Sequence, residues 1–81
     1  MKVSVRFFAR CREIVGEERK EIEIEDGRDM LLEDIITHLI NEYPDLKREK
    51  LLISRNHKYA KPEERLEDMD EIAIFPPVSG G

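Results

Sequence analysis

One long amphipathic segment in the middle of this chain constrains its fold more than any other feature. Apolar side chains recur there at the spacing of a single helix face: Leu32, Ile35, Ile36, Leu39, Ile40 and Tyr43. The spacing predicts a helix over residues 30–43, with Asp29 capping its start and Pro44 ending it. A single helix covers only one face of a sheet. A sheet built from the rest of these 81 residues therefore keeps its other face open.

Segments that alternate polar and apolar residues lie on both sides of this helix and predict strands. The expected strands are residues 2–8, 20–25, 51–53, 57–60 and 71–75. The alternation places Phe8 and Phe75 on the face away from the helix, and Asp26-Gly27 is expected to supply a turn before it.

A short helix is expected directly after the first strand, over residues 9–15. Cys11, Ile14 and Val15 follow helical spacing, and Gly16 stands where the helix should end. We interpret Cys11 as a small buried apolar side chain, with a persulfide relay as the alternative.

This order of elements predicts an α+β fold of the β-grasp, or ubiquitin-like, type. Its features are a mixed sheet, one long helix packed on one face, and a short helix after the first strand. We expect residues 1–75 to form this domain, because a chain of 81 residues supports a single core. Residues 76–81 are expected to form an extended, flexible tail.

The tail has the composition of a segment that enters another protein. Pro76 and Pro77 cannot donate ladder hydrogen bonds, so strand pairing should stop there. Six extended residues reach ~20 Å beyond the fold. Gly80 and Gly81 form the narrowest possible backbone, which is able to thread a tunnel. The candidate reactive group is the C-terminal carboxylate of Gly81, after activation by ATP.

Composition excludes several classes of function. The 14 Lys and Arg against 19 Asp and Glu give a net charge of -5, which opposes nucleic-acid binding and favours a basic protein partner. The single cysteine excludes a multi-thiolate metal site, and His38 and His57 have no further ligand at metal-binding spacing. No signal peptide or membrane span is apparent. We expect a cytoplasmic chain without metal, cofactor, nucleic acid or membrane.

Two strings of residues carry a resemblance to a known family. They are Phe7-Phe8-Ala9-x-x-Arg12-Glu13 and Leu66-x-Asp68-x-Asp70-Glu71-Ile72-Ala73-Ile74-Phe75-Pro76-Pro77-Val78-Ser79-Gly80-Gly81. Together they are similar to MoaD, the small sulfur-carrier subunit of molybdopterin synthase, within the MoaD/ThiS ubiquitin-like family. Met69 departs from the family's Asp-Gly-Asp turn, and a left-handed conformation there would cost ~1 kcal/mol or more.

The resemblance implies a role as a sulfur carrier in molybdenum or tungsten cofactor biosynthesis. In this family a MoeB-like ATP-dependent enzyme adenylates the position that matches Gly81, which then becomes a thiocarboxylate. The tail enters the large, MoaE-like subunit of the synthase, where sulfur passes to cyclic pyranopterin monophosphate. The small subunit is not catalytic on its own.

The partner-binding surface is expected to combine the open sheet face with the tail. Phe8 and Phe75 follow from the alternation, and the resemblance adds Tyr59 as an apolar contact position. The tail residues expected to contact the partner are Pro76, Pro77, Val78 and Ser79, with Gly80 needed for threading. An acidic group, Glu67, Asp68, Asp70 and Glu71, is a candidate for steering a basic partner.

Other functions share the same features. A ubiquitin-like modifier would join Gly81 to target lysines, and a carrier for another sulfur pathway would use the same thiocarboxylate. A passive interaction module would need neither Gly80 nor Gly81. The modified product in cells distinguishes these functions.

Overall fold

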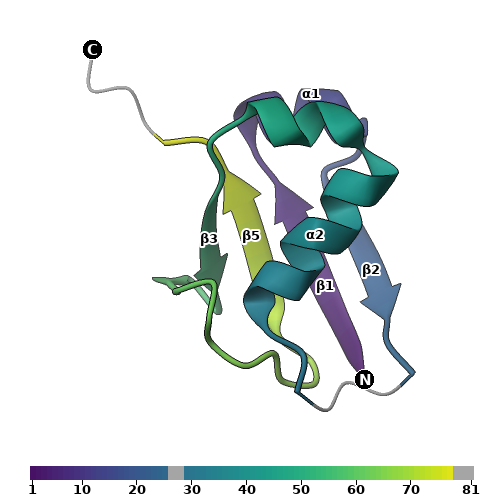
Figure 1. The fold of residues 1–81 in the computed structure, drawn as a ribbon, viewed down its shortest axis with the longest axis vertical. Coiled ribbons are helices and arrows are strands. Elements are labelled where there is room, and N and C mark those ends of the chain that lie inside the picture. The colour runs from purple at the N-terminus through teal and green to yellow at the C-terminus, as the bar shows by residue number, and fades with distance from the viewer. Residues whose placement is uncertain (26–28, 78–81) are drawn as a thin grey trace.

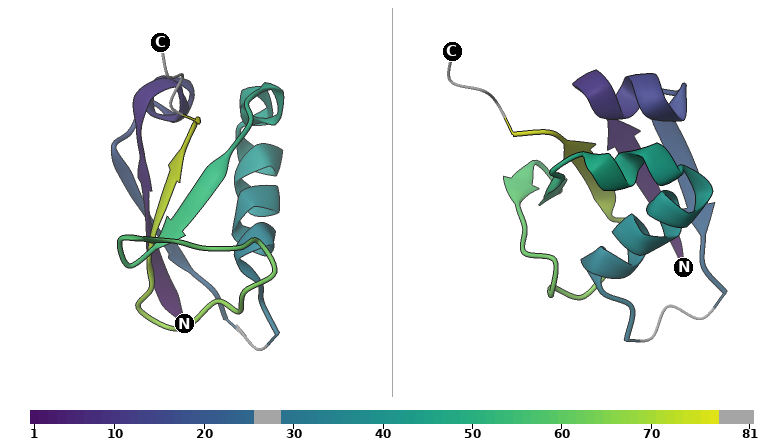
Figure 2. Two further views of the ribbon diagram at one scale, coloured as in Figure 1. Left: turned by 90° about the vertical axis from the view of Figure 1, so that its left-hand side faces the viewer. Right: turned by 45° about the horizontal axis from the view of Figure 1, so that its top comes forward.

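The computed structural model describes residues 1–25 and 29–77 and has the α+β architecture predicted from the sequence. Its elements are β1 (Lys2–Phe7), α1 (Ala9–Val15), β2 (Arg19–Glu23), α2 (Leu32–Glu42), the 3-10 helix η1 (Pro44–Arg48), β3 (Leu52–Arg55), β4 (Lys58–Tyr59) and β5 (Glu71–Phe75). The strands form a mixed five-stranded sheet in the order β2-β1-β5-β3-β4. Helix α2 crosses one face of this sheet (Figures 1 and 2).

The first and last strands of the chain are neighbours at the centre of the sheet. β1 and β5 run parallel, with Val5 opposite Ile72 and Phe7 opposite Ile74. The pairs β1–β2, β3–β5 and β3–β4 are antiparallel. β1 and β5 point the same way (Figure 1), so the register places Phe7 and Phe75 toward the same end of the sheet.

The core lies between the sheet and α2. Its fully buried large side chains are Phe7, Leu32, Ile35, Leu39, Leu46, Ile72 and Ile74. Cys11 is also fully buried, as predicted, and Gly16 ends α1 in the left-handed conformation with φ 83°. The helical and strand spacings of the sequence therefore identified the core faces correctly.

The start of α2 differs from the prediction, because Asp29 does not cap it. Leu31 is the N-cap residue, and its backbone N–H donates to the Asp34 carboxylate at 2.8 Å. The next two N–H groups of the helix donate to Glu64 O at 2.9 Å and Pro62 O at 3.0 Å. A distant loop thus satisfies donors that a local cap would otherwise satisfy. Asp29 instead binds the guanidinium of Arg65 at 2.7 Å.

The predicted end of this helix needs a smaller correction. Helix α2 ends at Glu42, and Pro44 is the first residue of η1 rather than a simple stop. Proline suits this position because its fixed φ is compatible with the first turn of a helix. The predicted turn at Asp26-Gly27 lies outside the described residues.

The turn before β5 is held by two carboxylates of the predicted acidic group. Asp68 accepts a hydrogen bond from Lys2 N–H at 2.8 Å. Asp70 is only 3% exposed and accepts from Glu67 N–H at 2.8 Å. Asp70 is therefore part of the turn and not of a solvated steering surface. Between them, Met69 has φ 67°, the left-handed conformation anticipated for a position that is glycine in the resembling family.

We expect Met69→Gly to raise the free energy of unfolding by about 1 kcal/mol, because glycine adopts a positive φ without the Cβ clash of other residues. Urea denaturation of the two proteins measures the difference. Met69→Ala is the matched control, since it removes the exposed side chain but keeps Cβ. A glycine variant no more stable than the alanine variant would contradict the backbone explanation.

Candidate functional site

The chain leaves the sheet directly after β5. Phe75 is the last strand residue, Pro76 is half-buried, and Pro77 is exposed. Pairing thus ends where the first proline removes a backbone donor, as predicted. In Figure 1 this exit lies at the end of the sheet that also carries α1. The predicted site residues Val78, Ser79, Gly80 and Gly81 lie outside the described residues.

Two of the predicted aromatic residues pack together beside this exit. The rings of Tyr59 and Phe75 have centroids 5.9 Å apart and planes inclined by 58°. This tilted arrangement is favourable for aromatic pairs. Tyr59 is 77% exposed, so the pair presents apolar surface to solvent on the sheet face that α2 does not cover. The left view of Figure 2 shows that α2 lies on one side of the sheet only.

Phe8 is held on the same face by the backbone. Its N–H donates to Ile74 O at 3.3 Å, and its carbonyl accepts from Cys11 N–H at 3.1 Å. The side chain is 42% exposed, and the guanidinium of Arg6 lies 5.4 Å from the ring centre. Ala9 has φ 51° where the chain turns into α1. The open face therefore carries all three predicted aromatic residues, two in contact and one tied to β5 by its main chain.

Sequence reasoning missed an aliphatic neighbour of this aromatic pair. Leu52 lies directly opposite Phe75 in the β3–β5 register and is half-buried. Its sequence neighbour Ile53 is in the core, so the alternation in this strand placed Leu52 on the open face. The sequence did not show that Leu52 lies beside Phe75, because that contact depends on the pairing of β3 with β5.

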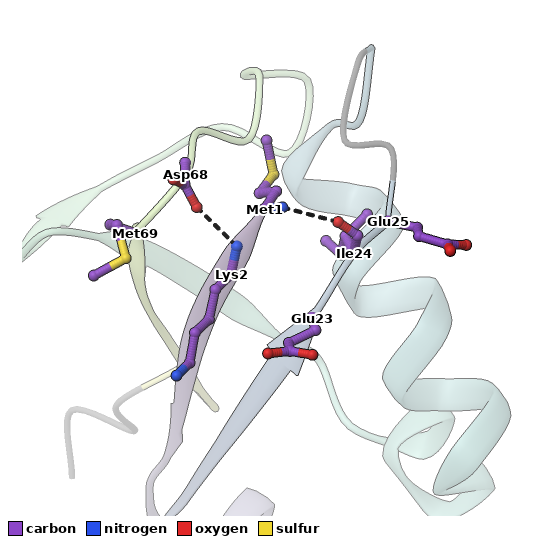
Figure 3. Close-up of a pocket in the computed structure, with 7 residues that line it drawn as sticks. All are labelled: Met1, Lys2, Glu23, Ile24, Glu25, Asp68 and Met69. Atoms are coloured by element: carbon purple, nitrogen blue, oxygen red, sulfur yellow. Dashed lines mark hydrogen bonds between the residues drawn. The ribbon is translucent and has the colours of Figure 1, made fainter.

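A hollow lies at the other end of the sheet. It has a volume of about 710 Å³ and is lined by Met1, Lys2, Glu23, Ile24, Glu25, Asp68 and Met69 (Figure 3). Met1 N donates to Ile24 O at 3.0 Å there, so these groups join β1 to the end of β2. The hollow is at the start of β1, whereas the tail leaves from the end of the parallel strand β5. We therefore do not assign it to the tail chemistry.

The described residues contain no group of three or more His, Cys, Asp or Glu side chains arranged to hold a metal ion. Nor does any helix among them have the length and apolar character needed to cross a membrane. The candidate site is the tail exit together with the open aromatic face, because β5 ends at Phe75 beside the Tyr59 ring.

Nearly all of the chain matches a known family. Residues 5–81 match the ThiS family. The chain belongs to this family. It is 34% identical to the molybdopterin synthase sulfur carrier subunit of Chlamydomonas reinhardtii, with all of both chains covered. It is 33% identical to the protein of that name from Haemophilus influenzae, covering 98% of this chain and 99% of the relative.

Solved structures extend these similarities within the family. A putative molybdopterin converting factor subunit 1 from Pyrococcus furiosus superposes with a TM-score of 0.85 at 31% identity, covering 96% of this chain and 99% of the other. Small archaeal modifier protein 1 of Haloferax volcanii has a TM-score of 0.82 at 26% identity, with 95% and 98% covered. Subunit 1 in a complex with subunit 2 of molybdopterin-converting factor from Helicobacter pylori has a TM-score of 0.66 at 28% identity, with both chains fully covered. These similarities confirm the β-grasp fold and the resemblance drawn from the two ends of the chain.

The burial of Cys11 generates a prediction about its reactivity. Burial raises the pKa of the Cys11 thiol, and the nearby Glu49 carboxylate raises it further. We expect the native protein to resist alkylation by iodoacetamide at neutral pH and to react fully in denaturant. Mass spectrometry after timed labelling measures this. Rapid labelling of the native protein would contradict the buried thiol and favour the relay alternative.

Proposed function

We propose that this chain is the sulfur-carrier subunit of a molybdopterin synthase and that the carboxylate of Gly81 carries the sulfur. The observation that supports this most is the full-length similarity to molybdopterin synthase sulfur carrier subunits. The geometry agrees with it, because the central strand β5 leads directly into Pro76 and Pro77. Residues 1–75 act as the rigid carrier domain and residues 76–81 as the tail. The carrier acts in the cytoplasm.

The chemistry takes place at the end of the tail. A carboxylate oxygen of Gly81 attacks the α-phosphate of ATP on a MoeB-like enzyme, which releases pyrophosphate and leaves an acyl adenylate. Hydrosulfide then displaces AMP and leaves a thiocarboxylate. Within the large, MoaE-like subunit the thiocarboxylate sulfur bonds to a carbon of cyclic pyranopterin monophosphate and displaces an oxygen substituent from it, and water then cleaves the acyl–sulfur bond to restore the carboxylate and leave the sulfur on the substrate. The small subunit supplies no catalytic side chain in this scheme.

The tail composition fits these transfers. Gly80 and Gly81 present the least bulky backbone available to an enzyme that must reach the carboxylate. Pro76 and Pro77 stiffen the base of the tail, so that less conformational entropy is lost when it enters a partner. Val78 and Ser79 lie between these two parts and contact the tunnel wall of the partner.

We expect incubation with ATP, hydrosulfide and the adenylating enzyme of the same organism to replace one oxygen of Gly81 by sulfur. Intact-mass spectrometry detects the mass increase, and fragmentation places it on the last residue. A chain that lacks Gly81 is the control and should stay unmodified. No increase with an enzyme that is shown to be active would contradict the proposed function.

The aromatic face serves as the docking surface for the large subunit. We expect Phe75→Ala to weaken binding about tenfold or more, because a half-buried aromatic in contact with an exposed second ring is typical of interface hot spots. Isothermal titration calorimetry measures the affinity, and circular dichroism checks that the variant remains folded. Met69→Ala is the matched control, because Met69 is 74% exposed but adjoins the start of β1. Equal binding by both variants would remove the aromatic face from the proposal.

A second candidate function is protein modification. The similarity to small archaeal modifier protein 1 favours it, at a TM-score of 0.82. Both functions use an activated Gly81, so the product distinguishes them. A modifier leaves Gly-Gly remnants on target lysines after protease digestion, whereas a carrier accumulates the thiocarboxylate.

A further inference from the structure

Two arginines face one another on the open side of the sheet. Arg6 of β1 and Arg19 of β2 are directly opposite in the antiparallel register, and both are exposed. Arg6 lies between the buried residues Val5 and Phe7, so its side chain projects away from the core. Lys20, the neighbour of Arg19, reaches the Tyr43 hydroxyl at the end of α2, so Arg19 projects to the other face. The two guanidinium groups therefore share the uncovered face.

This pair lacks the carboxylates that accompany other arginines of the protein. Arg10, Arg12, Arg55 and Arg65 each form an ion pair with an Asp or Glu. Within residues 1–25 and 29–77, neither Arg6 nor Arg19 forms one. Two carboxylates on this face lie two residues along the strands and have other neighbours: Glu21 binds Lys2 at 3.2 Å, and Glu71 lies 3.7 Å from His57.

Like charges directly opposite one another destabilise an antiparallel pair of strands. The isolated chain thus holds two opposed cations, and neither forms an ion pair within the described residues, although Glu21 and Glu71 lie two residues away on the same face. An external anion that binds between them would remove the repulsion and gain two charge-assisted hydrogen bonds. The planar guanidinium fork is suited to carboxylate groups in particular.

The position of the pair connects it to the aromatic face. The Arg6 guanidinium lies over the Phe8 ring. Beside them is a hollow of about 40 Å³, lined by Arg6, Phe8, Ser54, His57, Glu71 and Ala73. A protein that covers Phe8 therefore brings its own side chains next to Arg6, and Arg19 is the next residue across the sheet.

We propose that Arg6 and Arg19 together bind an acidic side chain of the protein that docks on the open face. This inference rests on the proposed function, in which that protein is the large synthase subunit. It differs from the expectation drawn from the net charge of -5, which favours a basic partner. The electrostatic potential at a docked side chain depends mainly on the charged groups closest to it. Salt largely screens exposed charges that are more than about 10 Å away.

The test is calorimetric binding of the full chain to the large subunit of the same organism. We expect Arg6→Gln and Arg19→Gln each to weaken binding several-fold, and the double variant to weaken it roughly tenfold and to lose part of its salt dependence. Arg48→Gln is the matched control, because Arg48 is exposed in η1, outside the sheet, and its loss changes the net charge equally. The control should bind like the unaltered chain.

Thermal melting separates docking from a structural role. Removal of one arginine relieves the like-charge repulsion, so the melting temperature of Arg19→Gln should stay the same or rise while affinity falls. A fall in melting temperature that parallels the loss of affinity would overturn the inference. Affinities equal to that of Arg48→Gln would overturn it as well, while leaving the proposed function intact. Failure of the unaltered chain to bind the large subunit would contradict both.

Discussion

The parallel pairing of β1 with β5 is the contact on which the rest of this structure depends. It buries Val5, Phe7, Ile72 and Ile74 together at the centre of the sheet. Burial of each large apolar side chain contributes roughly 1.5–3 kcal/mol relative to exposure, so this pair of strands stabilises the fold strongly. The residues are far apart in sequence, so a long loop must close before the pairing forms, and such non-local pairing slows folding. Its position is also what connects the core to the tail, because β5 continues into Pro76.

The two faces of the sheet have separate roles. One face is filled by α2 and carries the stability of the domain, while the other holds Phe8, Tyr59 and Phe75 at the surface. A sheet with a single covering helix cannot avoid this division. The proposed docking on the open face would therefore impose little on the core, and substitutions there are expected to change binding more than folding. The face is also mixed in charge, with two arginines near the aromatic residues in a protein of net negative charge.

Prediction from the sequence succeeded where the signal is local. The bounds of α1 and β5 and the burial of Cys11 followed from spacing within a few residues. The cap of α2 was predicted wrongly, since a favourable residue at position 29 was present but carbonyls of Pro62 and Glu64 bind the helix donors. Asp70 was counted among surface carboxylates because its neighbours are acidic, yet the backbone of Glu67 holds it inside the turn. Both differences arise from contacts that bring distant or folded-back segments together.

The sequence by itself determined the spacing of apolar residues and hence the faces of each element, the position where strand pairing ends at Pro76, and the glycine pair that defines the tail. These properties depend on residues two to four positions apart or on single side chains, so they can be read along the chain. Tertiary structure alone decided that Tyr59 packs on Phe75, that Leu52 adjoins it, and that Arg6 faces Arg19. Strand order and register set these neighbours, because a shift of one residue in any pairing would place different side chains together.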